Sequence, residues 1–278
     1  KNQAIFLCLP HHQSMEIAAK FRKHAVKVID LSADFRFSQT RVYEKVYGKH
    51  TQKQLNRSSS YGLCEIFSEE IKQSHLIGVP GCYVTSILLA LAPLLQNQLI
   101  IPNNIICDSK SGSSGAGRSA KVDQLLAESY GNFKAYGIGN HRHRPEIEEK
   151  LSLLASDKVK ISFTPHLLPI SRGILSTCYA QPIRKWNNKK LTDVFRKFYQ
   201  RSPFVKVVDS EHPPHIKQVV GTNECHLSVH YDDHSEKIII VSVLDNLLKG
   251  ASGQAVQCFN LMYGLNETNG LSKIALHP

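Results

Sequence analysis

One cysteine in the sequence lies where a reactive thiol is expected. Cys82 follows Pro80 and Gly81, a pair that favours a tight turn, and precedes an apolar stretch at 83–95 that is typical of a buried helix. A thiol in the first turn of a helix faces free N–H groups, and these favour the thiolate, which is the nucleophilic form. The sequence therefore predicts a catalytic nucleophile at Cys82, although a small buried residue is the more common role of a cysteine.

Two histidines lie directly before a second predicted helix. His141 and His143 flank Arg142, and Pro145 with acidic residues behind it indicates a helix start. On an extended approach to that helix, both histidines point to one side and Arg142 to the other. Either histidine is then available as a general acid or base near neutral pH. A surface position without a role is the alternative, and no metal site is expected because the sequence offers no third ligand nearby.

Small residues and arginines indicate a site for an anion. The segment 108–118 is rich in serine and glycine, includes Ser111 and Gly112, and ends at Arg118. Small side chains let backbone N–H groups approach an anion, and a guanidinium binds a carboxylate or phosphate through two hydrogen bonds. Arg172 lies at a turn before a predicted strand and suits the same purpose, with a purely structural arginine as the alternative.

A further turn of small residues, at 243–255, includes Asn246 and Gly250 and leads into a predicted helix. Backbone amides at such a helix start can face a ligand. Taken alone, the turn is also compatible with a helix start that has no ligand.

The elements that must position these motifs fall into two groups. Apolar strands at 4–9 and 26–31, with a helix at 14–20 between them, predict a parallel sheet of the Rossmann type. From about residue 80 the expected strands often alternate, which favours a mostly antiparallel sheet with one covered face. These strands are expected at 105–108, 160–164, 174–182, 226–231 and 237–243, and helices at 83–95, 144–154, 191–199 and 253–263. The predicted fold is α/β, an incomplete Rossmann-type parallel sheet domain plus an α+β catalytic or dimerisation domain.

The composition argues against several other classes of protein. The chain has 278 residues, 42% hydrophobic and 21% charged, and no apolar run is long enough to cross a bilayer. The net charge of +11 could attract nucleic acid, but Lys and Arg are spread along the chain, so small anionic ligands are favoured as partners. Seven scattered cysteines without a C-x-x-C pair indicate a reducing, cytoplasmic location rather than a disulfide framework.

Together, and in this order, these motifs resemble the N-acetyl-gamma-glutamyl-phosphate reductases of arginine biosynthesis. The resemblance runs from about residue 5 to residue 271, and its motifs are Leu-Ser-Ala-Asp-Phe-Arg-Phe at 31–37, Pro-Gly-Cys-Tyr at 80–83, Ser-Gly-Ala-Gly-Arg at 114–118, His-Arg-His at 141–143 and Pro-His-Leu at 165–167. It implies the architecture of the glyceraldehyde-3-phosphate and aspartate-semialdehyde dehydrogenase group, with NADP as cofactor. The implied domains are an NADP-binding part at 1–80, a catalytic part at 81–248, and a C-terminal helix at 249–278 that returns to the first domain.

The resemblance also implies a role for each candidate residue. Cys82 is the nucleophile that forms a thioester, and one of His141 and His143 is the acid/base. Arg118 and Arg172 hold the substrate. The residues near the cofactor are Ser111, Gly112, Asn246 and Gly250. The implied reaction is NADPH-dependent reduction of N-acetyl-gamma-glutamyl phosphate to the semialdehyde, with release of phosphate, by a homo-oligomeric enzyme.

Two alternative hypotheses stay open. The first is a reductase of another amino-acid acyl phosphate, such as aspartyl phosphate, because the same machinery serves several side chains. The second is a non-catalytic fragment or nucleic-acid-binding remnant. Family members begin with a strand, a glycine-rich turn and a helix that bind the cofactor's pyrophosphate, and no such segment precedes Lys1. A stretch of roughly 30 residues or more is therefore expected to be missing.

Overall fold

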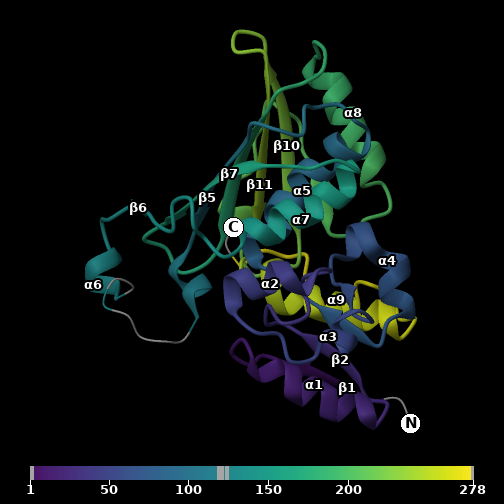
Figure 1. Cartoon of the computed structure of the whole chain (residues 1–278). Helices are drawn as coiled ribbons and strands as arrows, with labels where there is room; N and C mark the ends of the chain where they lie inside the picture. Colours follow the sequence, from purple (N-terminus) through teal and green to yellow (C-terminus); the bar gives the residue numbers. More distant parts are fainter. Residues whose placement is uncertain (1–2, 118–121, 123–124, 277–278) are drawn as a thin grey trace. The chain divides into compact units, whose positions relative to one another are not determined.

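The fold consists of two compact units, and each is described by itself (Figure 1). The computed structural model describes residues 3–117, 122 and 125–276. The smaller unit comprises residues 1–81 and 251–271, and the larger unit comprises residues 82–250 and 272–278. The chain beyond residue 271 thus groups with the larger unit, whereas the expected domains placed it with the preceding helix. In that segment the backbone N–H of Leu276 donates to the carbonyl of Val220 at 2.9 Å.

A four-stranded parallel sheet forms the centre of the smaller unit. Its strands lie in the order β1 (Ala4–Leu7), β2 (Lys27–Asp30), β4 (Leu76–Gly78) and β3 (Ser60–Tyr61), and all neighbours are parallel. Helix α1 (Gln13–Lys23) connects β1 to β2, as the apolar strands with a helix between them predicted. The predicted Rossmann-type sheet is therefore confirmed.

Both faces of this sheet are covered, because successive residues of each strand point to opposite sides. Val28 on β2 belongs to a core that includes residues of α1. Its neighbour Ile29 belongs to a second core, which includes residues of α4 (Cys64–Gln73) and α9 (Gly253–Met262). Since α9 contacts both α4 and β2, the smaller unit is built from two segments that are far apart in the sequence.

Several elements of the smaller unit were not predicted. They are the helices α2 (Thr40–Tyr47), α3 (Lys53–Asn56) and α4, and the short strands β3 and β4. Helix α2 has an apolar stripe at Val42, Tyr43, Val46 and Tyr47, and Tyr43 is buried in the core of the smaller unit, so the sequence offered a signal that the analysis did not use. A hydrogen bond of 2.8 Å from the Tyr43 hydroxyl to the Asp34 carboxylate also anchors the helix.

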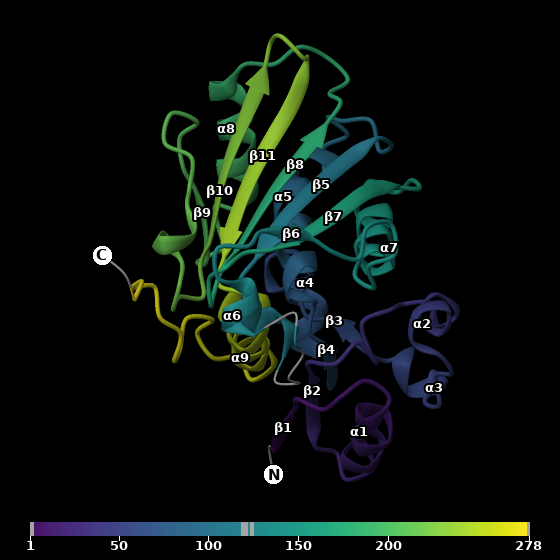
Figure 2. The same cartoon turned by 90° about the vertical axis from the view of Figure 1, so that its left-hand side faces the viewer.

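A seven-stranded mixed sheet forms the centre of the larger unit (Figure 2). Its strands lie in the order β6 (Lys134–Ala135), β7 (Ile161–Leu167), β5 (Ile105–Ser111), β8 (Ile174–Ala180), β11 (Lys237–Leu244), β10 (Cys225–Asp232) and β9 (Val205–Val207). The β7–β5 and β10–β9 pairs are parallel, and the other neighbours are antiparallel. The mostly antiparallel sheet is confirmed, and with the parallel sheet it gives the predicted α/β fold.

Helices cover one face of this second sheet. They are α5 (Cys82–Gln96), α7 (Arg144–Ala155) and α8 (Asn188–Phe198), and α5 contacts the middle strands β8 and β11. The hydroxyl of Ser86 on α5 lies 2.9 Å from that of Ser176 on β8, so Ser176 points to the helices. Its strand neighbours Leu175 and Thr177 lie on the opposite face and are partly exposed. Shorter turns are η1 (Ser113–Ala116), α6 (Leu126–Ser129), η3 (Ile216–Gln218) and the π-helix η4 (Leu248–Ser252).

Helix α5, which begins at Cys82, is enclosed along its length. All of its residues from Tyr83 to Leu95 are buried, and it contacts α7, α8 and the sheet. Contact on every side explains why the sequence here is continuously apolar rather than amphipathic. Among the described residues, no helix is both long and apolar enough to span a membrane.

Candidate active site

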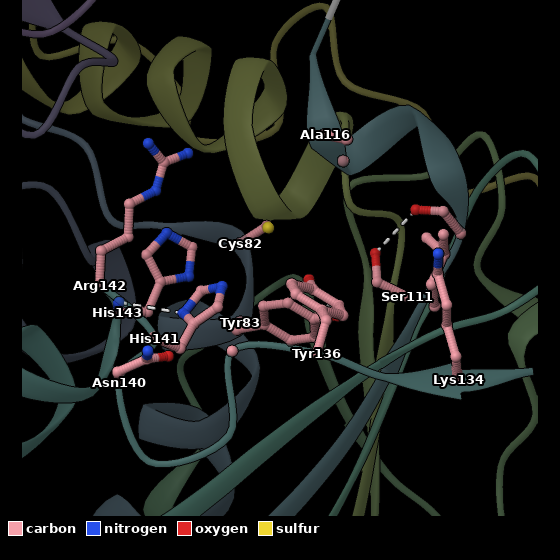
Figure 3. A pocket seen from close by; sticks show the side chains of 14 residues that line it. Cys82, Tyr83, Ser111, Ala116, Lys134, Tyr136, Asn140, His141, Arg142 and His143 are labelled. Carbon is pink, nitrogen blue, oxygen red and sulfur yellow. Dashed lines mark hydrogen bonds between the residues drawn. The ribbon is translucent and has the colours of Figure 1, made fainter. Parts of the chain in front are cut away.

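The predicted nucleophile lies at a cavity in the larger unit (Figure 3). Cys82 is the first residue of α5 and is partly exposed, whereas five of the other cysteines are buried. The cavity has a volume of about 460 Å³. Besides the thiol, its lining includes four rings and two cations, those of Tyr83, Tyr136, His141, His143, Lys134 and Arg142. The turn and the apolar run thus place Cys82 at a helix start that a small molecule can reach.

Gly250 lies directly behind the nucleophile. It is buried in the π-helix η4, and its N–H donates to the carbonyl of Asp245 at 2.9 Å. A Cβ atom at this position would lie 2.8 Å from the Cβ of Cys82. Any side chain larger than hydrogen would therefore displace one of the two residues. Gly250 was expected near the cofactor, and the structure places it against Cys82.

Both predicted histidines line the cavity with their rings side by side. The ring centroids of His141 and His143 are 4.9 Å apart, and the backbone N–H of His143 donates to Nδ1 of His141 at 3.1 Å. The predicted extended approach is wrong, because His143 has helical backbone angles of −77° and −21° and serves as the N-cap of α7. The helical conformation starts one residue before α7, and a turn rather than a strand brings the two rings together.

Burial sets the charge state of the first histidine. Removal from water, and to a lesser extent the positive charge of Arg142, lower the pKa of His141 to about 4. The ring is therefore neutral near pH 7.

Two tyrosines that the sequence analysis did not single out complete the wall. The hydroxyl of Tyr136 donates to that of Tyr83 at 3.1 Å, and Tyr83 donates to the carbonyl of His166 at 3.2 Å. Burial raises the pKa of both phenols, so both remain protonated at neutral pH. The signal that could have found them is proximity to the motifs, since Tyr83 follows Cys82 directly and Tyr136 comes shortly before His141.

The cations of the cavity are Lys134 and Arg142. Lys134 was not predicted, because its strand β6 has only two residues and leaves no pattern in the sequence. Arg118, which the sequence analysis proposed for substrate binding, lies outside the described residues. The described part of the cavity therefore offers two positive charges, neither of them an arginine predicted for that purpose.

Arg172 has a different environment from the one predicted. It is not among the described residues that line the cavity, and its Nη2 lies 3.0 and 2.9 Å from the two carboxylate oxygens of Asp245. Asp245 is completely buried and also accepts hydrogen bonds from the backbone N–H groups of Gly221, Leu247 and Leu248. A buried carboxylate requires such partners. Arg172 thus holds the turn that follows β11.

The glycine-rich loop after β5 contributes Ser111 and Gly112 to the cavity. The N–H of Gly112 donates to the carbonyl of Gly173 at 2.9 Å, and a Cβ at Gly112 would lie 2.6 Å from the carbonyl oxygen of Ser171. Glycine is needed here because two backbone segments lie this close together. The sequence predicted that this backbone approaches an anion, and the contact that the structure shows is with a neighbouring loop of the chain, so the anion site stays a prediction.

Asn246 joins the two loops and is not among the described residues that line the cavity. Its Oδ1 accepts from the N–H of Gly173 at 2.6 Å, and its Nδ2 donates to the hydroxyl of Ser114 at 2.9 Å. Because the side chain is buried, these bonds are shielded from water and fix both loops. Of the four residues expected near the cofactor, Ser111 and Gly112 line the cavity, and Asn246 and Gly250 support it.

The described residues contain no group of three His, Cys, Asp or Glu side chains that could hold a metal ion. All seven cysteines are free thiols. Even Cys64 and Cys258, whose sulfur atoms are 3.4 Å apart, are not joined. The chemistry of the cavity is thus that of a thiol, imidazoles, phenols and cations.

Two semialdehyde dehydrogenase families match the chain. The family described as semialdehyde dehydrogenase, NAD binding domain, matches residues 1–74, and semialdehyde dehydrogenase, dimerisation domain, matches residues 82–246. Aspartate semialdehyde dehydrogenase II from Vibrio cholerae is similar in structure, with a TM-score of 0.72 at 16% identity over 94% of this chain and 80% of that chain. For aspartate semialdehyde dehydrogenase with NADP from Candida albicans, the TM-score is 0.67 at 12% identity over 94% and 77%. These identities show a shared fold alone.

Bacterial relatives are similar in sequence along the whole chain. N-acetyl-gamma-glutamyl-phosphate reductase of Geobacter metallireducens is 48% identical over 279 residues, which cover 100% of this chain and 81% of that protein. The protein of the same name from Gloeothece citriformis is 47% identical over 279 residues, with 99% and 79% covered. That from Moorella thermoacetica is 47% identical over 277 residues, with 99% and 80% covered. The chain therefore belongs to the N-acetyl-gamma-glutamyl-phosphate reductase family.

Proposed function

We propose that this chain reduces N-acetyl-gamma-glutamyl phosphate to N-acetylglutamate semialdehyde and phosphate with NADPH, as an enzyme of arginine biosynthesis. The observation that carries the proposal is Cys82 at the first residue of α5, in one cavity with His141 and His143. A thiol at a helix start beside imidazoles has what nucleophilic catalysis requires. Membership of the reductase family supplies the substrate.

Cys82 acts as the nucleophile. Its thiolate attacks the acyl carbon of the acyl phosphate, a C–S bond forms, the C–O bond to phosphate breaks, and phosphate leaves. The product of this step is a thioester at Cys82. N–H groups at the start of α5 favour the thiolate and the oxyanion that develops during attack, because the partial charge of a helix N-terminus is positive.

The glycine loop fits the cofactor's reactive end. A Cβ at Gly115 would lie 3.1 Å from the hydroxyl of Ser111 and 3.5 Å from Nδ2 of Asn246, so glycine keeps this side of the cavity open. Ser111 and Gly112 would lie against the cofactor, with Asn246 and Gly250 supporting them. When bound, NADPH supplies the two electrons that reduce the thioester. The family match covers an NAD-binding domain, and NADP rather than NAD is our proposal.

His143 moves the proton. Reduction of the thioester gives a thiohemiacetal on Cys82, and His143 takes its hydroxyl proton as the C–S bond breaks and the thiolate returns. Two observations favour His143 over His141. Nδ1 of His141 is already occupied by the N–H of His143, and burial lowers the pKa of His141 to about 4.

Lys134 and Arg142 bind the negative charges of the substrate. The substrate carries a carboxylate and a phosphate. Lys134 and Arg142 are the cations among the described residues that line the cavity. We propose the same role for Arg118, from its place in the glycine-rich segment. Arg172 supports the site through Asp245.

A second copy of the chain is the partner that we propose, bound to the helix-free face of the seven-stranded sheet. The matched family is described as a dimerisation domain. On this face, Thr177 on β8 is paired with Val241 on β11, and the adjacent pair of outward residues is Tyr179 with Ile239. Leu175, Tyr179, Val241 and Ile239 are apolar and only partly buried, and a second sheet would cover them.

We propose a cytoplasmic location. All seven cysteines are free, including the adjacent Cys64 and Cys258. Thiols this close together persist where glutathione and thioredoxin keep them reduced.

The reverse reaction tests the proposed function. With phosphate and NADP present, the protein should oxidise N-acetylglutamate semialdehyde, which is followed by the absorbance of NADPH. Aspartate semialdehyde should be used with a kcat/KM lower by more than about tenfold, because its amine and shorter chain fit a different set of partners. NAD in place of NADP tests the cofactor. Equal or better oxidation of aspartate semialdehyde would reject the substrate assignment.

A further inference from the structure

We propose that His141 is a neutral hydrogen-bond donor in the catalytic site, whose Nε2–H donates to the oxygen that becomes negatively charged on the acyl carbon. Proton transfer is then left to His143. The proposal rests on the proposed function, because the oxyanion arises only when Cys82 attacks a carbonyl carbon. It gives the two histidines of one short motif different tasks.

The backbone determines which nitrogen of His141 carries the proton. The N–H of His143 donates to Nδ1 of His141 at 3.1 Å. A backbone amide is always a donor, so Nδ1 must offer its lone pair, and the proton of the neutral ring is on Nε2. A proton added to Nδ1 would break this hydrogen bond and bring two N–H groups together. The contact therefore selects one tautomer and disfavours the charged ring.

The protonated nitrogen is available to a ligand. Within the described part of the chain, the His141 ring makes one hydrogen bond. It accepts this bond through Nδ1 from the backbone N–H of His143. The ring lines the cavity that Cys82 also lines. In Figure 3 the second ring nitrogen of His141 lies on the side of the ring toward Cys82. A carbonyl oxygen of a bound acyl group is the acceptor that this arrangement fits.

Four aromatic rings hold the His141 ring in place. Its centroid distances are 4.9 Å to His143, 5.3 Å to Phe163, 5.6 Å to Tyr136 and 5.9 Å to Tyr83. All four contacts are close to edge-on, the arrangement that aromatic pairs prefer. The direction of Nε2–H is therefore fixed before substrate binds. A donor fixed in advance stabilises a developing charge without the cost of reorientation.

The charges around His141 also favour the neutral ring. Burial and Arg142 lower its pKa to about 4, and the hydroxyls of Tyr83 and Tyr136 stay uncharged because burial raises their pKa values. None of the described carboxylates forms an ion pair with His141 to counter this effect. A ring that protonates so weakly is a poor base at pH 7 but remains a good donor through Nε2.

NMR of the imidazole nitrogens tests the tautomer without reference to activity. In the resting protein, Nδ1 of His141 should be unprotonated and Nε2 protonated, with no change from pH 8 down to about pH 5. His141→Gln assigns the signal by its loss. His166, whose Nδ1 lies 3.0 Å from the carboxylate of Asp108, is an internal comparison outside the cavity lining. A proton on Nδ1, or protonation of His141 between about pH 6 and 7, would overturn the proposal.

Kinetics of two variants test the function of the donor. His141→Gln keeps an N–H group near the position of Nε2, whereas His141→Leu keeps bulk without a donor. The kcat of the Leu variant should fall about 10²- to 10³-fold and that of the Gln variant much less. The pH profile of kcat/KM should keep its shape in both, because no titrating group has been removed. His166→Gln, outside the cavity lining, should resemble the parent.

The opposite kinetic results are also decisive. If the Leu variant loses one limb of the pH profile, His141 is the acid/base, and if both variants match the parent, His141 contributes nothing. A parent protein that oxidises no semialdehyde would instead reject the proposed function, and the NMR result would still decide the state of His141.

Discussion

A methyl group at Gly250 would lie 2.8 Å from the Cβ of Cys82 and 3.2 Å from its Cα. Gly250→Ala should therefore push the nucleophile and the first turn of α5 out of position. Misplacement of a reacting group by about 1 Å can cost about 10²-fold in rate. We expect kcat to fall by that order, measured in the semialdehyde assay, and the rate of Cys82 alkylation to change with it.

Gly62→Ala is the matched control for this prediction. A Cβ at Gly62 would lie 2.6 Å from the side chain of Ile77, so the substitution also overcrowds a core, but in the smaller unit. Overcrowding costs about 1 to 3 kcal/mol of stability. Gly62→Ala should lose stability yet leave Cys82 alkylation as in the parent. If Gly250→Ala keeps the kcat of the parent, the close contact has no catalytic role.

Cys82→Ser should keep the fold and lose turnover. A hydroxyl is much less nucleophilic than a thiolate near neutral pH, and the side chains are nearly the same size. Circular dichroism checks the fold and the semialdehyde assay checks activity. More than about a tenth of the parental kcat in the Ser variant would exclude Cys82 as the nucleophile.

Alkylation by iodoacetamide should be selective for Cys82. Five cysteines are buried, so Cys8 is the relevant competitor as the exposed one. Partial burial and the charge of Asp30 raise the pKa of Cys8, which makes its thiolate scarce at pH 7. Peptide mapping by mass spectrometry should show Cys82 labelled first. Equal labelling rates of Cys8 and Cys82 would contradict activation by the helix start.

Arg172→Lys should affect stability more than substrate binding. Nη2 of the guanidinium reaches both oxygens of the buried Asp245, and the more strongly hydrated ammonium of lysine is costlier to hold there. Because Asp245 keeps its backbone donors, the loss should be about 1 to 2 kcal/mol. Thermal unfolding and KM, measured on the same preparation, separate the two roles. A raised KM with an unchanged melting temperature would place Arg172 on the substrate instead.

The parts of the site that the sequence predicted are those that local geometry determines. Pro80 and Gly81 end a strand and turn the chain, the apolar run after them forms a buried helix, and Cys82 is consequently its first residue. His141 and His143 are neighbours in sequence, so they had to lie close together. Even here the conformation was predicted incorrectly, because the helical angles of α7 begin at His143.

The parts that could not be predicted depend on contacts between distant segments. Nothing in the sequence near Cys82 indicates that Gly250 lies behind it. The buried Asp245 determines the position of Arg172, and 73 residues separate the two. A strand as short as β6, which has two residues, carries no periodic pattern. Lys134 and Tyr136 were missed for this reason.

Asp30 should make the protein less stable as the pH rises. Burial raises its pKa from 3.8 to about 6, although Ser32 donates two hydrogen bonds to it. Between these values the folded state binds more protons than the unfolded state, so stability falls from about pH 4 to pH 6 and the loss persists above. Asp30→Asn removes this dependence, which amounts to at most about 3 kcal/mol.

Denaturation of Asp30→Asn and the parent across this pH range measures the effect. The difference in the free energy of unfolding should grow in favour of the Asn variant as the pH rises. Asp233→Asn, at an exposed position, gives the control and should run parallel to the parent. A constant offset between Asp30→Asn and the parent would show that folding does not raise the pKa of Asp30.

Leu175→Glu should separate the proposed dimer. Leu175 on β8 is partly exposed, and its side chain lies on the face of the sheet opposite to Ser176 and α5. If a second copy covers this face, the carboxylate of the Glu variant would be buried at the interface. Leu153→Glu is the matched control, because Leu153 is 59% exposed on helix α7 and lies outside the proposed interface. Sedimentation should give half the mass for Leu175→Glu and the parental mass for Leu153→Glu. Because the charge is harmless on a solvated sheet, a parental mass in both variants would show that the second copy binds elsewhere.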